Sequence, residues 1–216
     1  MFKRHVRLPV LALLASLLLA SACTAQPSDP APYVEGTDYV TLPAPHQRYS
    51  SEGKVELVEV FSYGCIHCAQ FAPDAEKLRK ELPAGVEFKL LPAPFNQQWV
   101  PFARAYYAAK QLGVVERTHL QLFVAKFGEH YPINSMDELA DFYAREGVDR
   151  AAFMRAAMAP ATTEKMKRDL DLLRTWQVDG TPTLVIDGKY RVASVRSHER
   201  MLAVALWLAK RELAGK

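Results

Sequence analysis

The chain has 216 residues, of which half are hydrophobic, and it carries 27 Lys and Arg against 24 Asp and Glu. Three of the basic residues, Lys3, Arg4 and Arg7, lie near the N-terminus, where no acidic residue precedes position 23, so the remainder holds 24 charges of each sign. This balance leaves no basic surplus of the kind that nucleic-acid binding needs. The length suits one elaborated domain, or a core domain with an insertion.

The first 22 residues have the pattern of an export signal, because a positive start is followed by an apolar run from Leu8 to Ala20. That run is too short to span a membrane comfortably. Ordinary signal peptidase can cut after Ala22, but the small residues that precede Cys23 also resemble the bacterial lipobox. We predict lipid attachment at Cys23, with a free or removed cysteine as the alternative. Either route leads to an oxidising compartment, where a disulfide is chemically sensible.

Residues 23–38 are rich in Pro, Ser, Asp and Ala and predict an extended tether. A folded pattern begins at residue 39 and includes a β-α-β unit, whose crossover is expected to be right-handed. Pro73 should kink or end the helix of that unit. The predicted elements are strands at 39–42, 55–61 and 86–91 and a helix at 65–81.

Between residues 98 and 177 the pattern is helical throughout. Ser135 begins a capping-box sequence, and Asp149 is a suitable N-cap for the helix that follows it. The predicted helices are 98–112, 116–129, 136–146, 150–158 and 162–177. Eight aromatic side chains have spacings that favour a helix-on-helix core over a ligand pocket: Phe102, Tyr106, Tyr107, Phe123, Phe127, Phe142, Tyr143 and Phe153.

The strand pattern returns after residue 177. Asp187-Gly188 is a strong hairpin signal between predicted strands at 183–186 and 189–192. A last amphipathic helix is predicted over 197–213. The order of elements is therefore β-α-β, a helical block, and β-β-α.

Cys65 and Cys68 have the spacing of a pair that can close a disulfide at the start of a helix. Unpaired backbone N–H groups and the helix dipole favour a thiolate there. Haem attachment needs a histidine at position 69, which is Ala69, and a structural zinc needs more ligands than His67 supplies. A static structural disulfide is the remaining alternative, but a disulfide that encloses only two residues stabilises a fold very little. The pair predicts redox catalysis without a metal or a cofactor.

A second feature is Thr181-Pro182, directly before the strand at 183–186. Proline at the entrance to a buried strand cannot donate a ladder hydrogen bond. A cis bond there would turn the chain and leave the backbone of Thr181 free for a visiting peptide.

Together these features resemble a thioredoxin fold. A helical block inserted between the two halves of that fold, together with His67 as the third residue of the cysteine motif, resembles the DsbA family of periplasmic thiol:disulfide oxidoreductases. The resemblance covers residues 39 to 213, and it implies an α/β thioredoxin fold with an inserted all-helical domain. The domains that it implies are a first half at 39–97, an inserted helical domain at 98–165 and a second half at 166–216.

The resemblance also implies roles for individual residues. Cys65 would be the exposed nucleophile, Cys68 its buried partner, Pro182 the cis-proline that faces them, and Glu59 a buried carboxylate under the active site. His67 would hydrogen-bond or electrostatically stabilise the Cys65 sulfur.

Two further positions, Ile66 and Thr181, would contact substrate and tune the redox potential. Ile66 replaces a proline that is common in the family, and Thr181 occupies a position where valine is frequent in strong oxidases. These departures leave open how strongly the pair oxidises.

The implied function is donation of the Cys65–Cys68 disulfide to reduced exported proteins. The implied partner is a quinone-linked inner-membrane oxidase that recycles a monomeric enzyme, which is periplasmic and tethered through Cys23. The alternatives are a periplasmic reductase or isomerase, or a thioredoxin-fold peptide-binding or chaperone module. The histidines without partner spacing are expected at the surface: His46, His119, His130 and His198.

Overall fold

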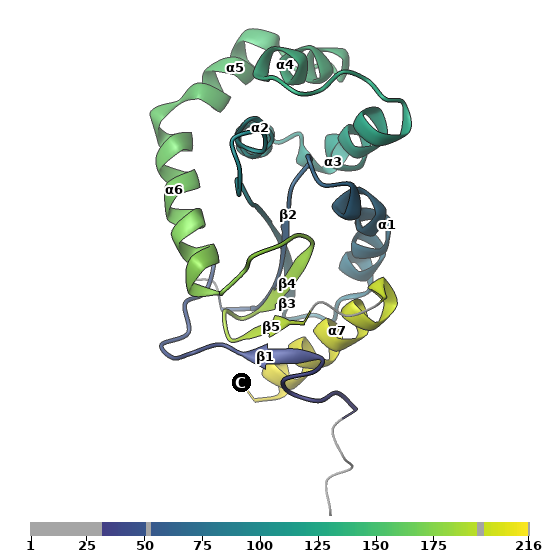
Figure 1. Ribbon diagram of the computed structural model, residues 1–216, viewed down its shortest axis with the longest axis vertical. Coiled ribbons are helices and arrows are strands. Elements are labelled where there is room, and N and C mark those ends of the chain that lie inside the picture. The colour runs from purple at the N-terminus through teal and green to yellow at the C-terminus, as the bar shows by residue number, and fades with distance from the viewer. Residues whose placement is uncertain (1–31, 51–52, 194–196, 216) are drawn as a thin grey trace, which may run out of the picture. The chain divides into compact units, whose positions relative to one another are not determined.

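The computed structural model describes residues 32–50, 53–193 and 197–215 (Figure 1). The predicted export signal at 1–22 and Cys23 lie outside these described residues. Five strands form one mixed sheet in the order β1-β5-β4-β2-β3, in which only the β2–β3 pair is parallel. The strands are β1 (Tyr39–Thr41), β2 (Val55–Phe61), β3 (Val86–Pro92), β4 (Thr183–Ile186) and β5 (Tyr190–Val192).

The helices follow the predicted order closely. They are α1 (Ile66–Glu81), α2 (Val100–Gln111), α3 (Val115–Phe123), α4 (Met136–Arg145), α5 (Arg150–Met158), α6 (Pro160–Thr175) and α7 (His198–Ala214), with a π-helical segment η1 (Val124–Gly128) after α3. Pro73 does not end α1, which continues through it to Glu81. Likewise α6 passes through residue 165, the predicted end of the inserted domain, as one helix.

Alternation along β2 divides the core between the two faces of the sheet. Val55 and Leu57 pack with α1 and α7, while Val58 and Val60 pack with α6 on the opposite face. Figure 1 shows α6 on one side of β2 and α1 on the other. Since side chains in a strand alternate with a period of two, Glu59 falls on the same face as Leu57, the face that α1 covers.

Helices α2 to α5 and η1 pack into a second core that continues to the C-terminal end of β2. Seven of the eight aromatic residues predicted to form this core are buried there, and Phe127 is partly buried against it. The structure therefore confirms a helical block inserted into an α/β fold. Near the other edge of the sheet, Asp187 and Gly188 both have positive φ and form the predicted hairpin turn.

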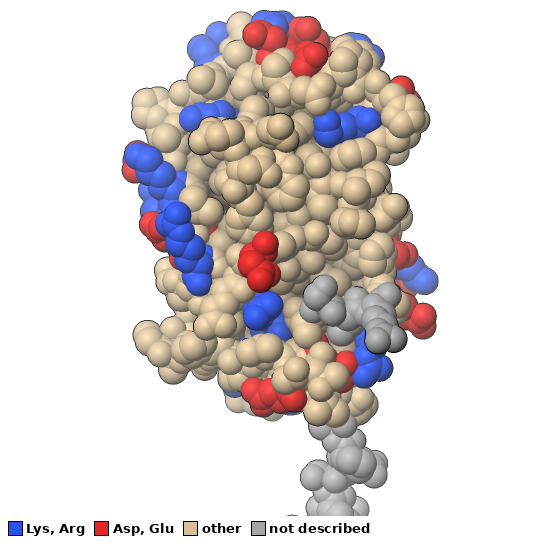
Figure 2. Space-filling model, in the orientation of Figure 1, with Lys and Arg blue, Asp and Glu red and all other residues tan. Residues whose placement is uncertain are grey.

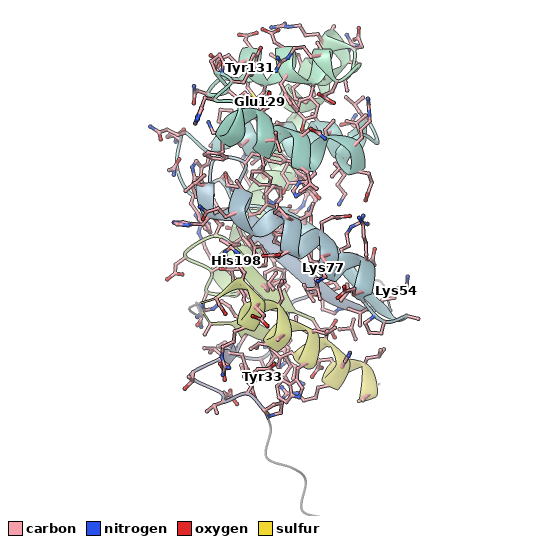
Figure 3. The ribbon with its side chains drawn as sticks, turned by 90° about the vertical axis from the view of Figure 1, so that its right-hand side faces the viewer. Tyr33, Lys54, Lys77, Glu129, Tyr131 and His198 are labelled. Carbon is pink, nitrogen blue, oxygen red and sulfur yellow. The ribbon has the colours of Figure 1, made fainter. Side chains whose placement is uncertain are left out.

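The folded domain begins earlier than residue 39. The ring of Tyr33 packs edge-on against Trp207 of α7, and the buried carboxylate of Asp38 binds Arg200 of the same helix. Figure 3 shows Tyr33 beside α7 and His198 between α7 and α1. Residues 33–38, which the sequence assigned to the tether, are thus held against α7.

Candidate active site

Cys65 is the N-cap residue of α1. Its sulfur accepts a hydrogen bond from the backbone N–H of Cys68 at 3.4 Å, in the position that a Ser or Asp oxygen takes in an ordinary cap. A tight turn presents this sulfur, because the N–H of Cys65 donates to the carbonyl oxygen of Ser62. The first turn of α1 contains no acidic residue. The helix dipole and its free N–H groups are therefore directed at Cys65 without a competing carboxylate.

The pKa of the Cys65 thiol falls from 9.0 to about 5. The largest cause is a hydrogen bond from the Cys68 side chain, and the backbone N–H groups of Cys68 and His67 add to it. Burial opposes these effects but is outweighed. At neutral pH the Cys65 sulfur is consequently a thiolate, which is the reactive form of cysteine.

Cys68 lies under Cys65 in the aromatic core that joins the sheet to the helical block. Its side chain is fully buried, and burial is the main cause that raises its pKa far above the ordinary value. Cys65 itself is only 6% exposed, much less than the sequence led us to expect. Both cysteines are free thiols here. The two sulfurs are thus close in space and opposite in acidity.

The loop before β4 completes the surroundings of the thiol. The Thr181–Pro182 peptide bond is cis, as the sequence analysis expects. In its thiol form, Cys65 Sγ donates to the carbonyl oxygen of Thr181 at 3.4 Å, although 116 positions separate the two residues. Thr181 Oγ1 is buried beside the two thiols, and the side chain of Thr181 also helps to lower the pKa of Cys65.

His67 and Ile66 lie on the exposed side of the first turn of α1. It is the backbone N–H of His67, rather than its imidazole, that contributes to the low pKa of Cys65. Ile66 is 44% exposed and is one of the few large apolar side chains at the surface of the described chain. Figure 2 shows that this face is largely uncharged around the β2–α1 connection, with acidic atoms visible nearer its centre.

Glu59 is 1% exposed, and neither of its carboxyl oxygens has a hydrogen-bond partner among the described residues. Burial, and to a smaller degree the negative charge of Cys65, raise the pKa of Glu59 to about 8. The charge of Glu59 in turn raises the pKa of Cys68. This carboxyl group is therefore protonated at neutral pH and electrostatically coupled to both thiols.

Sequence reasoning missed His119, which was expected at the surface. Its Nδ1 is 3.0 Å from the hydroxyl of Tyr63, two residues before Cys65, and its ring packs edge-on against Phe61. Burial lowers the pKa of His119 to about 4. His198 is also not free at the surface, since its ring packs on Phe71 and Nδ1 lies 3.5 Å from Asp74. No local signal identifies these contacts, because each partner is distant in the sequence.

Trp99 was also missed. Its indole covers Gly64, the residue before Cys65, so closely that a Cβ at position 64 would lie 2.8 Å from Trp99 Cδ1 and Nε1. Trp99 also stacks with Phe95. The glycine is thus needed so that the loop carrying the thiol can pack beneath an aromatic side chain.

No group of three or more His, Cys, Asp and Glu is placed to hold a metal ion within the described ranges. Within the same ranges, no helix has the length and hydropathy needed to cross a membrane.

Comparison with protein families matches residues 99–206 to the DSBA-like thioredoxin domain. The chain is 36% identical over 209 residues to the thiol:disulfide interchange protein DsbA of Pseudomonas aeruginosa, covering 95% of this chain and 97% of that protein. The crystal structure of the same relative superposes with a TM-score of 0.78 at 35% identity, covering 85% of this chain and 96% of that one.

The oxidoreductase DsbA from Xylella fastidiosa is similar to the same degree. Its crystal structure superposes with a TM-score of 0.79 at 36% identity, and the match covers 84% of this chain and 98% of that one. These similarities span both halves of the sheet and the inserted helices.

Proposed function

Because the chain belongs to the DSBA-like thioredoxin family, we propose that Cys65 and Cys68 are the pair through which it acts as a thiol:disulfide oxidoreductase. The observation that carries this assignment is the Cys65 sulfur at the N-cap of α1, bonded to the N–H of Cys68 and 3.4 Å from the carbonyl oxygen of Thr181. The direction of the reaction is oxidation of exported proteins.

In the first step, a substrate thiolate attacks Cys65 Sγ of the oxidised enzyme. The Cys65–Cys68 bond breaks, a mixed disulfide forms, and Cys68 leaves with the electron pair. Because Cys68 has a raised pKa, it must take up a proton as it leaves. Glu59 is the group that we assign to supply this proton, since its carboxyl is neutral, has no competing hydrogen bond and interacts electrostatically with Cys68.

In the second step, another substrate thiolate attacks the substrate sulfur of the mixed disulfide. The substrate disulfide forms, and Cys65 leaves as a thiolate. A pKa of about 5 makes Cys65 a good leaving group that needs no proton at neutral pH. Two substrate thiols thus lose two electrons and two protons, and the enzyme retains the electrons as one thiol and one thiolate.

The low pKa of Cys65 also sets the direction of the exchange. Stabilising the thiolate stabilises the reduced enzyme, so its disulfide accepts electrons readily, and DsbA proteins are known to be strong oxidants for this reason. This supports an oxidase over a reductase. The Thr181 carbonyl and the exposed side chain of Ile66 would receive the extended substrate segment.

Several finer assignments complete the proposal. Residues 1–22 direct export to the periplasm, and Cys23 attaches the chain to a membrane through lipid. The domain divisions proposed are 39–97, 98–165 and 166–216, with residues 33–38 added to the fold by their contacts with α7 and with α6 crossing the division at 165. The enzyme acts as a monomer on reduced exported proteins, and a quinone-linked oxidase of the inner membrane restores its disulfide.

The assignment is tested with a fluorogenic peptide that carries two cysteines. The oxidised protein should close the peptide disulfide stoichiometrically, and the Cys65→Ser variant should not. Substantial oxidation by Cys65→Ser would contradict the assignment. Equilibration of the Cys65–Cys68 pair with glutathione then separates an oxidase, whose pair stays largely reduced, from a reductase.

A further inference from the structure

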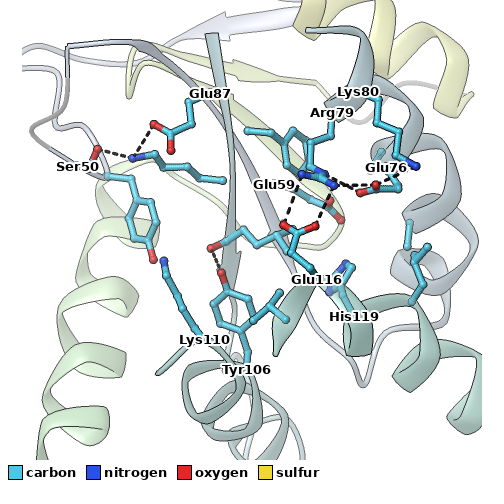
Figure 4. Close-up of a pocket in the computed structure, with 18 of the residues that line it drawn as sticks. Ser50, Glu59, Glu76, Arg79, Lys80, Glu87, Tyr106, Lys110, Glu116 and His119 are labelled. Carbon is cyan, nitrogen blue, oxygen red and sulfur yellow. Dashed lines mark hydrogen bonds and ion pairs between the residues drawn. The ribbon is translucent and has the colours of Figure 1, made fainter. Parts of the chain in front are cut away.

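A second feature, which is lined by Glu59 but by neither cysteine, is a groove along the outer edge of β3, with a cavity volume of about 840 Å³. We call it the edge groove. Figure 4 shows its two walls. One comes from α1, with Arg79, and the other includes Ser50 and Lys165 of α6. Lys110 of α2 and His119 of α3 close one end.

The backbone of β3 presents open hydrogen-bonding groups to this groove. The N–H of Val55 bonds to the carbonyl of Gly85, and the N–H of Ala93 bonds to that of Phe61. Because successive residues of a strand direct their backbone groups to opposite sides, odd-numbered residues of β3 face β2 and even-numbered ones face outward. The bond from the Tyr106 hydroxyl to the outward carbonyl of Leu90 agrees with this register.

In the part of β3 that lines the groove, residues 87–90, three outward groups remain open: the N–H and C=O of Phe88 and the N–H of Leu90. None of them has a backbone partner in the described part of the chain, where β3 pairs only with β2. Such an alternation of donors and acceptors along an open edge matches an added strand. A small anion, in contrast, would bind only to the two N–H groups and leave the carbonyl of Phe88 without a partner.

At the closed end of the groove, two lysines are paired with carboxylates and a third is not. Lys89 is paired with Glu56, and Lys165 with Asp169. Lys110 has no carboxylate within ion-pair distance among the described residues, and its ammonium lies 5.8 Å from the ring centroid of Tyr49. Loss of hydration, followed by repulsion from Lys165 and Lys89, lowers the pKa of Lys110. This end of the groove therefore favours a negative charge.

We propose that the edge groove binds an extended peptide, which adds a strand to β3 through Phe88 and Leu90 and places an acidic side chain against Lys110. A single peptide fits better than a second copy of the chain, because the walls on both sides exclude a strand that carries its own helices. The inference rests on the proposed function in one respect, because it takes the peptide to be a segment of an unfolded substrate protein.

The groove has a consequence for substrate handling. Its lining includes Glu59 but neither cysteine nor Pro182, so a segment bound there leaves the thiols accessible. The same substrate molecule can then present its cysteines at a raised effective concentration.

The test uses reduced, carboxymethylated α-lactalbumin, an unfolded acidic polypeptide without reactive thiols, and the mature protein in its dithiol form. Titration should shift the amide NMR signals of Phe88 and Leu90 and slow hydrogen exchange at Phe88. Lys110→Gln should weaken this binding about fivefold, as expected for loss of one partly exposed ion pair. Lys80→Gln is the matched control, because Lys80 also lines the groove but is paired with Glu76, and it should bind as the wild type does.

Three results would overturn the inference. The first is a set of shifts confined to the surroundings of Cys65 and Pro182, with equal affinity in Lys110→Gln. The second is a response at Lys110 without shifts at Phe88 and Leu90, which indicates an anion rather than a strand. The third is a change in the β3 signals with protein concentration alone, which indicates a second copy. Since the probe cannot react with thiols, these results are independent of the oxidase assignment.

Discussion

The sulfur of Cys65 caps the helix that carries it, by accepting the N–H of Cys68 at 3.4 Å. The same two residues are linked a second time, because the Cys68 side chain is the main stabiliser of the Cys65 thiolate. Acidity at position 65 thus depends on both the backbone and the side chain of residue 68.

This double link predicts how the Cys65 pKa responds to substitution. In the reduced wild type, the rate of alkylation by iodoacetamide should rise with a midpoint near pH 5. Cys68→Ser should keep the midpoint low, because a hydroxyl can replace the donated hydrogen bond. Cys68→Ala should raise it, though not to the value of free cysteine, since the backbone donors remain. Equal midpoints in the two variants would show that the side-chain bond is unimportant.

The raised pKa of the buried Glu59 carboxyl predicts that the protein becomes less stable as pH rises. Its folded pKa of about 8 lies above the unfolded value of 4.5, so the unfolded state loses its proton first as pH rises. The free energy of unfolding should therefore fall between pH 4.5 and 8. Relative to the wild type, Glu59→Gln should gain on the order of 5 kcal/mol across this window in chemical denaturation.

Glu59→Gln also tests the proposed proton transfer. The variant should slow formation of the mixed disulfide, because Cys68 then leaves without a nearby proton donor. The alkylation midpoint of Cys65 should stay near that of the wild type, because Glu59 is not among the causes of its low pKa. A shifted midpoint with an unchanged rate would assign Glu59 to thiolate tuning instead.

Gly64 predicts a steric effect at the active site. In Gly64→Ala, the new Cβ would collide with the indole of Trp99 at 2.8 Å and with Phe102 at 3.1 Å. We expect a loss of about 1–3 kcal/mol in the free energy of unfolding, typical of overpacking, and a change in tryptophan fluorescence. Gly180→Ala is the control on the opposite loop, because a Cβ there meets nothing within 4 Å. Similar losses in both variants would contradict this explanation.

His119 predicts an acid-sensitive contact beside the active-site loop. Its folded pKa of about 4 lies below the unfolded value of 6.5, so the unfolded state gains a proton first as pH falls. Stability should therefore decrease from pH 6.5 toward 4, and less steeply in His119→Gln. Tyr63→Phe should cost about 1–2 kcal/mol at neutral pH, because Nδ1 loses its partner. A histidine NMR titration with a midpoint near 6.5 would contradict the prediction.

The positions of the strands and helices were largely readable from local pattern. The helix predicted over about 150–158 with Asp149 as its N-cap matches α5, Arg150–Met158. Pro73 shows the limit of such reasoning, because tertiary packing holds α1 together across a residue that disfavours a helix interior. Tyr33 shows it as well, since the ring that it packs against, Trp207, lies far along the chain.

The sequence alone identified the reacting pair. The spacing of the two cysteines permits a disulfide between them, and their place at a strand-to-helix junction puts them at a helix N-terminus, which favours a thiolate. The order of elements could be read in the same way, because burial in strands and helices leaves periods of two and 3.6 in the chain. Three relationships emerged only from the folded chain: the Thr181 carbonyl faces the Cys65 sulfur, His119 reaches Tyr63, and β3 has an open edge. The first two join residues distant in sequence, and the third depends on the order of the strands in the sheet. All three follow from tertiary packing, which no local pattern encodes.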